Sequence, residues 1–267
     1  MQPIKSAGVL PIDAAGLRVV VTAAGSGIGE VIARSFQIRG AQIYICDVVE
    51  SLVADTLKAI PGSHGSVADV GDPTAVDRMF DHIERTLGGV DVLINNAGVA
   101  GPTGPVENVK PDEVEETLRI NVESQFLCCR RVIPWMKKNG GGSIVNISSV
   151  AGRLAFAMRT PYAASKWGVI GFTKSLAMEV GRDNIRVNAI LPGHVNGPRF
   201  KRVWDTKAAK RGITPDEMYA EVLSCVASGR TVEMQDIANM ILYLTSPFGA
   251  AITGQAISVC GGVEMMR

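Results

Sequence analysis

Residues 19–33 read VVVTAAGSGIGEVIA, and this stretch decides the fold. Four β-prone residues lead into a loop of small residues, which leads into an apolar pattern with helical spacing. Gly25, Gly27 and Gly29 are spaced by two, and Glu30 departs from the common G-x-G-x-x-G pattern. A strand, a loop with few side chains and a helix N-terminus still let backbone N–H groups face an anion. The stretch therefore predicts a phosphate-binding turn; the alternative is a tight turn that needs glycine only for its geometry.

Short apolar runs alternate with longer helical patterns along the rest of the chain. Continuous apolar strands joined by crossover helices indicate a mostly parallel sheet covered on both faces. The expected fold class is α/β, a doubly wound, mostly parallel sheet of about seven strands, as in the Rossmann fold. The predicted strands are 17–23, 41–47, 65–69, 90–97, 142–149, 185–191 and 255–261, and the predicted helices are 27–39, 49–59, 73–87, 111–138, 161–181 and 233–245. Pro134, inside the fourth helix, is expected to kink it or to end its regular hydrogen bonding early.

Length and charge limit the possible functions. A chain of 267 residues that is 46% hydrophobic can form one core, so residues 1–267 are expected to fold as a single domain. A net charge of +1 provides no basic field, and nucleic acid is therefore not an expected partner. The five cysteines contain no C-x-x-C pair, which favours a reduced, cytoplasmic location and no metal site. No stretch approaches the roughly 18 apolar residues of a membrane span, so no membrane association is expected.

Asp47 ends the second predicted strand, after the glycine loop. In a dinucleotide-binding unit, an acid at this point accepts hydrogen bonds from the adenosine ribose and repels a 2′-phosphate. Its neighbours Ser26 and Val48 provide no cation for such a phosphate. Asp47 therefore predicts NAD as the cofactor, whereas an isolated aspartate would be only a solvated turn residue.

A second group of residues carries a chemical signal in SSVAGRLAFAMRTPYAASKWG, residues 148–168. Tyr162 and Lys166 are four apart in a helical pattern, so they share one face, and Ser149 lies at the C-terminal end of a predicted strand. A phenol has an unperturbed pKa of about 10, and a nearby ammonium can lower such a pKa by about 1 to 3 units. Tyr162 then becomes a usable general acid and base. A lone Tyr-x-x-x-Lys would more often be an ordinary helix face.

Taken together, these motifs resemble the short-chain dehydrogenase/reductase family over nearly the whole chain. TAAGSGIG resembles its glycine motif, and NNAG, residues 95–98, resembles its fourth-strand signature. Ser149, Tyr162 and Lys166 match its S-x12-Y-x3-K pattern, and RVNAILPG and ITGQAISVCGG resemble its late segments. The resemblance implies that the glycine loop holds the pyrophosphate of a nicotinamide dinucleotide.

The resemblance also implies roles for individual residues. Tyr162 would exchange the hydroxyl proton of the substrate, Ser149 would hydrogen-bond the same oxygen, and Lys166 would hold the nicotinamide ribose. Asn121 would carry a proton relay through water. The implied cofactor-binding residues are Ala24, Gly25, Ser26, Gly27, Ile28, Gly29, Asp47, Asp69, Val70, Asn95, Ala97, Gly98, Tyr162, Lys166, Pro192, Gly193 and Val195. Asn95 and Asn96 could also serve as buried asparagines that tie strands together.

Three positions depart from the family pattern. Ala23 replaces the first glycine of the glycine motif, and Gly197 stands where a threonine usually contacts the carboxamide. Cys260 replaces a common aspartate and is expected to be a buried thiol. The filled catalytic positions favour an NAD-dependent oxidoreductase that interconverts a secondary alcohol and a ketone, with a dinucleotide-binding sensor or scaffold as the alternative. The family further implies a homo-oligomer, usually a tetramer.

The substrate is the least explicit part of the sequence. Residues 193–230 have no strand pattern and many Lys and Arg, so they are predicted to form an insertion over the sheet edge. Arg153, Arg159 and Arg199 are candidate substrate contacts because an Arg can clamp a carboxylate or phosphate. They favour a small anionic substrate, such as a hydroxy acid or an acidic sugar. A neutral sugar, polyol or other alcohol stays open, as does reduction of a 3-oxoacyl thioester.

Overall fold

The structure is a computed structural model and describes residues 12–265, apart from the side chain of Arg199. Seven parallel strands form one sheet in the order β3-β2-β1-β4-β5-β6-β7. They are β1 (Arg18–Thr22), β2 (Gln42–Asp47), β3 (His64–Val67), β4 (Val92–Asn95), β5 (Gly142–Ile147), β6 (Ile185–Pro192) and β7 (Ala256–Val259). The predicted α/β class, the parallel sheet and the seven strands are confirmed.

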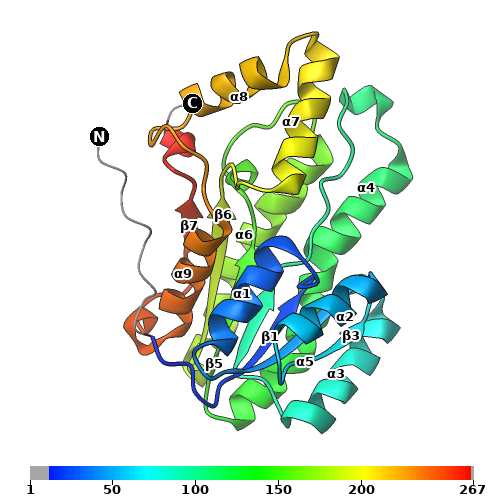
Figure 1. Ribbon diagram of the computed structural model, residues 1–267. Helices are drawn as coiled ribbons and strands as arrows, with labels where there is room; N and C mark the ends of the chain where they lie inside the picture. The colour runs from blue at the N-terminus through cyan, green and yellow to red at the C-terminus, as the bar shows by residue number, and fades with distance from the viewer. Residues whose placement is uncertain (1–11, 266–267) are drawn as a thin grey trace.

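Helices cover both faces of this sheet (Figure 1). Those that connect or follow the strands are α1 (Gly27–Gln37), α2 (Glu50–Ala59), α3 (Pro73–Leu87), α4 (Pro111–Leu118), α5 (Ser124–Lys138), α6 (Thr160–Val180) and α9 (Met234–Thr245). Between β6 and α9 lie α7 (Pro198–Arg211) and α8 (Pro215–Ser224), which project above the sheet in Figure 1.

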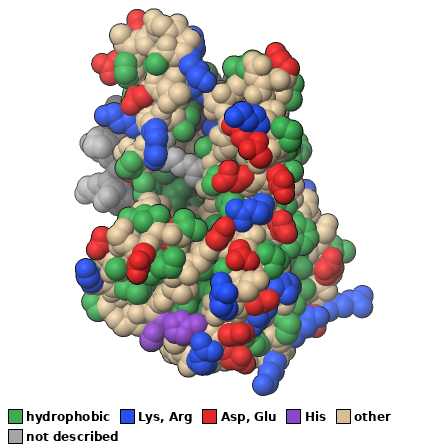
Figure 2. Space-filling model, turned by 90° about the vertical axis from the view of Figure 1, so that its right-hand side faces the viewer, with side chains coloured by type: hydrophobic (Ala, Val, Ile, Leu, Met, Phe, Trp, Pro, Cys, Tyr) green, Lys and Arg blue, Asp and Glu red, His purple; other side chains and the backbone are tan. Residues whose placement is uncertain are grey.

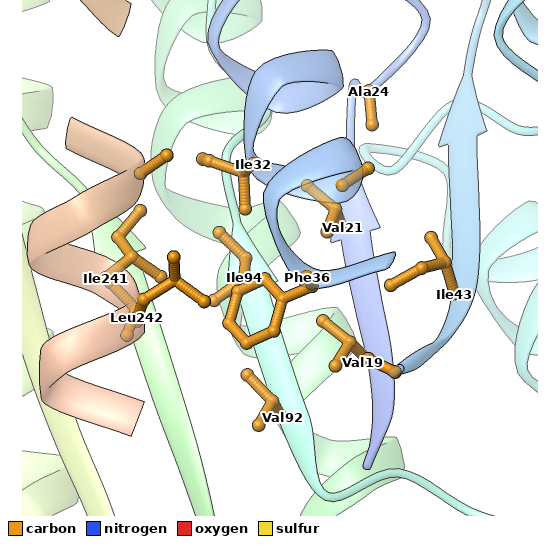
Figure 3. Packing of buried hydrophobic residues seen from close by; sticks show 14 of the residues in the cluster. Val19, Val21, Ala24, Ile32, Phe36, Ile43, Val92, Ile94, Ile241 and Leu242 are labelled. Carbon is orange, nitrogen blue, oxygen red and sulfur yellow. The ribbon is translucent and has the colours of Figure 1, made fainter. Parts of the chain in front are cut away.

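Alternation along the strands divides the core into two layers. Val19 and Val21 of β1 point to the face covered by α1 and α9, while Val20 points to the face covered by α3, α5 and α6. Figure 3 shows the first layer, where Phe36 of α1 and Leu242 of α9 pack over β1 and β4. All of these side chains are almost completely buried. Burial of each such side chain contributes about 1.5–3 kcal/mol to the stability of the fold. A shift of one strand along its neighbour would lose this burial, so the packing fixes where each strand ends.

The predicted helix 111–138 is interrupted once. Residues Arg119–Glu123 form a π-helical turn between α4 and α5. Pro134 does not end the hydrogen-bonded helix early, because α5 continues to Lys138. That part of the prediction was wrong: the loss of one N–H is tolerated near a helix end, where Cys128, Val132 and Met136 pack into the core.

Among the residues that the structure describes, no helix is both long enough and apolar enough to cross a membrane.

Candidate active site

A cavity of about 480 Å³ lies over the carboxyl ends of the central strands. Its wall combines the loop after β1, the end of β2, the segments after β5 and β6, and α7. The face in Figure 2 is hollowed between its upper and lower parts, and several Lys and Arg side chains lie along the upper border of the hollow. A parallel sheet of this topology binds ligands at this edge, so the cavity is the candidate active site.

The glycine loop leaves the N-terminus of α1 open toward the cavity. Ser26 is the N-cap but makes no side-chain cap hydrogen bond, and Ser26, Gly27 and Ile28 line the cavity. A Cβ at Gly29 would lie 2.5 Å from the carbonyl oxygen of Ala23, so only glycine allows this close approach. The uncapped first turn and its dipole suit a pyrophosphate, and the residues therefore fit a dinucleotide.

The first departure from the family pattern has a geometric consequence. Ala23 has a φ of 49°, in the left-handed region that glycine adopts most easily. The loop nevertheless keeps its shape, because Asn96 donates from Nδ2 to the carbonyl oxygens of Thr22 and Ala23 at 2.9 and 3.0 Å. The alanine therefore adds backbone strain, but the turn keeps its conformation.

Asp47 lies at the end of β2 and lines the cavity beside the loop. Its Oδ2 accepts a hydrogen bond from the N–H of Gly25 at 3.1 Å, and its Oδ1 accepts one from the N–H of Val49 at 3.2 Å. These bonds fix the carboxylate where a βαβ unit presents an acid to a ribose. The nearby lining residues, Ser26 and Ile28, carry no positive charge.

Ser149, Tyr162 and Lys166 line the same cavity. Lys166 is buried, with Nζ donating to the carbonyl oxygen of Ile147 at 2.9 Å and lying 5.7 Å from the ring centroid of Tyr162. Ser149 follows β5 as an N-cap, and its Oγ accepts from the N–H of Ala151 at 3.2 Å. The three side chains come from the segment after β5 and from α6, and together present a hydroxyl, a phenol and an ammonium.

Asn121 lies behind this group, in the π-helical turn. Its Nδ2 donates to Ser165 Oγ at 2.9 Å and its Oδ1 accepts from the N–H of Val99 at 2.7 Å. A Cβ at Gly98 would lie 3.1 Å from Asn121 Oδ1 and 3.3 Å from Lys166 Nζ. Gly98 therefore keeps a narrow space open between the amide and the ammonium, and π turns often occur at such functional positions.

The other predicted cofactor residues fall into two groups. Pro192, Gly193 and Val195 line the cavity, whereas Ala24, Gly25, Gly29, Asp69, Val70, Asn95 and Ala97 are not among the lining residues. Asp69 instead pairs with Arg119 at 2.9 Å. Asn95 donates to Asn146 Oδ1 at 2.9 Å and thereby ties β4 to β5. Asn95 therefore makes the contact between strands that was the alternative to cofactor binding.

The predicted substrate arginines lie in different surroundings. Arg159 lines the cavity, donates to the carbonyl oxygen of Ala100 and stacks on Tyr162, with 4.3 Å between Cζ and the ring centroid. Arg153 is not among the lining residues; it donates to Glu264 at 3.0 Å and to Ser258 at 3.3 Å, both near the C-terminus. The side chain of Arg199 lies outside the described part of the structure.

Residues 193–230 bring cavity residues that the sequence analysis missed. Phe200, Trp204 and Lys207 of α7 line the cavity. Phe200, Trp204 and the buried Ala208 recur at intervals of four, which is a helical apolar stripe. Pro198 at the helix start and Gly212 at its end, with φ of 67°, are further helix signals that could have predicted α7.

Gly197 explains another departure from the family pattern. It lines the cavity just before α7 and has a φ of 154°, which disfavours a threonine there. Cys260 is buried, and Gly193 packs so closely on it that a Cβ at Gly193 would lie 2.7 Å from the Cα of Cys260. The cysteine therefore acts as part of the packing beside the cavity wall.

The chain is similar to several known reductases and dehydrogenases. A family model described as enoyl-(acyl carrier protein) reductase matches residues 22–264. The chain is 35% identical to the granaticin polyketide synthase putative ketoacyl reductase 1 of Streptomyces violaceoruber, covering 97% of each chain. It is 33% identical to a D-beta-hydroxybutyrate dehydrogenase of Rhizobium meliloti, covering 91% of this chain and 96% of the other. Its structure resembles the actinorhodin polyketide ketoreductase solved with NADPH, with a TM-score of 0.89, 33% identity and coverage of 93% and 97%.

Proposed function

Because the chain belongs to the short-chain dehydrogenase/reductase family of oxidoreductases, we propose that it uses NAD to interconvert a secondary alcohol and its ketone. The observation that carries this proposal is that Ser149, Tyr162 and Lys166 line one cavity together with Asp47 and the open N-terminus of α1. A dinucleotide-binding sensor would need the glycine loop and Asp47 but not the hydroxyl, phenol and ammonium.

The chemistry assigned to each side chain follows from its place in the cavity. The nicotinamide cofactor, when bound, supplies the acceptor or donor of hydride. Tyr162 takes the proton of the substrate hydroxyl during oxidation and returns it during reduction. Ser149 orients the same oxygen by a hydrogen bond. Lys166, held by the carbonyl oxygen of Ile147, contributes a fixed positive charge beside the phenol and reaches the ribose hydroxyls.

The proton must also leave the cavity. Gly98 keeps a narrow space open, with the Asn121 side chain on one side of it and Lys166 Nζ on the other. A water in this space would accept a proton from Lys166 and hydrogen-bond the Asn121 side chain, which is the relay assigned to Asn121.

NAD is proposed over NADP because of Asp47. A 2′-phosphate would lie against this carboxylate, and the adjacent lining residues Ser26 and Ile28 provide no cation to compensate. The related ketoreductase was solved with NADPH, so relatives of this fold also bind the phosphorylated cofactor, and the choice of NAD for this chain rests on Asp47.

A second candidate is reduction of a ketoacyl group. The similarity to the granaticin ketoacyl reductase supports it. Asp47 weighs against it, since a reductive role would normally draw on NADPH. The remaining expected properties, a small substrate and a homotetramer, are part of the same proposal.

Two measurements test this function. Calorimetric titration with NAD and NADP should show binding with a clear preference for NAD, and a panel of secondary alcohols should reduce bound NAD, followed by the absorbance of NADH. Failure to bind either dinucleotide would refute the proposal. Binding of NAD without turnover by alcohols, and without oxidation of NADH by the matching ketones, would favour the sensor.

A further inference from the structure

Aromatic side chains are concentrated at one end of the cavity. The chain has only three Trp, four Tyr and seven Phe, yet Phe156, Tyr162, Phe200 and Trp204 all line this space. Their rings form two pairs, with centroids 6.5 Å apart for Phe156 and Tyr162 and 5.8 Å apart for Phe200 and Trp204. Flat apolar faces of this kind favour a ligand with an aromatic or similarly flat group.

Positive charges lie among these rings. Arg159, Arg202 and Lys207 line the cavity in addition to Lys166. Asp47 is the single carboxylate among the described lining residues, and its hydrogen bond to Gly25 holds it at the glycine-loop end. The aromatic end of the cavity is therefore lined by cations without a lining carboxylate.

Two of these cations lie over the ring of Phe156. Lys207 Nζ lies 5.1 Å from its centroid and 4.3 Å from that of Trp204, while Arg159 Cζ lies 5.6 Å from the Phe156 centroid. Aromatic faces attract cations but carry no net charge, so both side chains keep their positive charge beside the rings. An anion that reaches both cations would gain a charge-assisted hydrogen bond from each.

We infer that the substrate is a hydroxy acid, or the matching oxo acid, whose flat apolar group packs on Phe156 and Trp204 and whose carboxylate is bound by Lys207 and Arg159. Because Arg159 also stacks on Tyr162, the carboxylate lies within a few bonds of the reacting carbon. This assignment rests on the proposed function. Lys207 replaces Arg153 as the candidate contact for the anion, because Arg153 donates to Glu264 near the C-terminus.

Three probes separate the two features of this substrate. 3-Hydroxy-3-phenylpropanoate carries both the ring and the carboxylate, its primary amide lacks the charge, and 3-hydroxybutanoate lacks the ring. Each is titrated calorimetrically into the protein saturated with NADH, where an alcohol cannot react and binding is measured without turnover. The complete probe should bind at least about tenfold more tightly than either of the other two.

Variants assign the effect to residues. Lys207→Met keeps the length of the side chain and removes its charge, so the acid should bind only as well as the amide, and Lys207→Arg should restore most of the difference. Lys201→Met is the matched control, since Lys201 is an exposed lysine of the same helix outside the lining. Phe156→Leu should remove most of the advantage of the phenyl probe over 3-hydroxybutanoate.

Equal binding of the acid and the amide, no binding of the acid, or equal effects of Lys207→Met and Lys201→Met would overturn the inference and favour a neutral alcohol. Equal binding of the phenyl acid and 3-hydroxybutanoate would overturn the assignment of the flat group. Titration with NADH alone and oxidation of neutral alcohols test the proposed function separately, so its failure would be distinguished from failure of this inference.

Discussion

The two edges of the sheet treat their charged residues differently. At the amino edge, Arg18 at the start of β1 donates to both carboxylate oxygens of Asp91, at 2.9 and 2.6 Å. At the carboxyl edge, Asp47 accepts only backbone N–H groups, and Tyr162 and Lys166 face an open cavity. Arg18 and Asp91 neutralise each other, whereas the charged groups at the carboxyl edge are arranged around a space for a ligand.

Residues that stabilise the fold and residues that bind ligands therefore lie at opposite ends of the strands. In a parallel sheet each strand feeds its crossover helix at the carboxyl edge, so loops and helix N-termini gather there and leave polar groups available. At the amino edge, the Arg18–Asp91 pair instead joins the start of β1 to the residue before β4. Substitutions at the carboxyl edge should therefore change activity with little change in stability, and those at the amino edge should do the opposite.

The largest effect is expected from Tyr162→Phe. The substitution removes the proposed proton-transfer group and keeps the ring that packs against Arg159, so kcat should fall at least about 100-fold. Steady-state kinetics measures this, with thermal unfolding as the check on folding. Tyr243→Phe, on the outer part of α9, is the matched control and should retain activity. Activity near that of the wild type in a folded Tyr162→Phe protein would contradict the mechanism.

The next effect concerns the cofactor. Asp47→Asn weakens the acceptor for the adenosine ribose and removes the charge that repels a 2′-phosphate, so kcat/KM for NAD should fall about tenfold and that for NADP should rise. The ratio of the two kcat/KM values is the readout. Glu50→Gln removes an exposed carboxylate at the start of α2 and should leave the ratio unchanged. An unchanged ratio in Asp47→Asn would show that this carboxylate does not contact the ribose.

A smaller effect, on stability alone, is expected at the amino edge from Asp91→Asn. Burial opposes ionisation of Asp91, but hydrogen bonds from the side chain and backbone of Arg18 outweigh it and hold the pKa of Asp91 below its usual value. Since a depressed carboxyl pKa stabilises the fold above the unfolded-state pKa, the variant should lose about 1 kcal/mol at pH 7.

This loss should shrink as the pH falls below about 4, because the carboxyl group is then protonated first in the unfolded chain and, at still lower pH, in the folded protein. Urea unfolding at several pH values measures this loss of stability. At pH 7, kcat/KM of the Asp91→Asn variant should equal that of the wild type. Asp55→Asn, at an exposed pair with Lys58, is the control and should change stability little. A loss that is constant with pH would argue against the ion pair as its cause.

The smallest effect is a gain in stability from Ala23→Gly. Relief of the positive φ should stabilise the fold by about 1–2 kcal/mol, but the added freedom of the unfolded chain offsets about half of this. A net rise of about 0.5 kcal/mol in the free energy of unfolding is expected, measured by urea unfolding. Ala24→Gly, at a neighbouring buried alanine without a positive φ, should destabilise the protein instead. A destabilised Ala23→Gly protein would show that the turn is not strained.

The sequence by itself determined most of the sheet, because most strands are continuous apolar runs and the crossover helices have an apolar period of their own; β3, with the residues HGSV, is the exception. It also determined which residues stand at strand ends, which is why Asp47 and Ser149 could be identified before any geometry was known. The π-helical turn around Asn121 was not predicted, because the residues Arg119–Glu123 lie inside one uninterrupted helical pattern and the extra residue in the turn leaves no mark on it.

Only the tertiary structure decided which cations face the cavity. Arg153 and Arg159 are similar in sequence context, yet one turns to Glu264 and the other stacks on Tyr162. Lys207 is one of several basic residues in α7, and its ammonium reaches the cavity only because Trp204 and Phe156 flank it. The physical reason is that strand order follows from local apolar patterns, whereas the direction of a long charged side chain depends on neighbours that are distant along the chain.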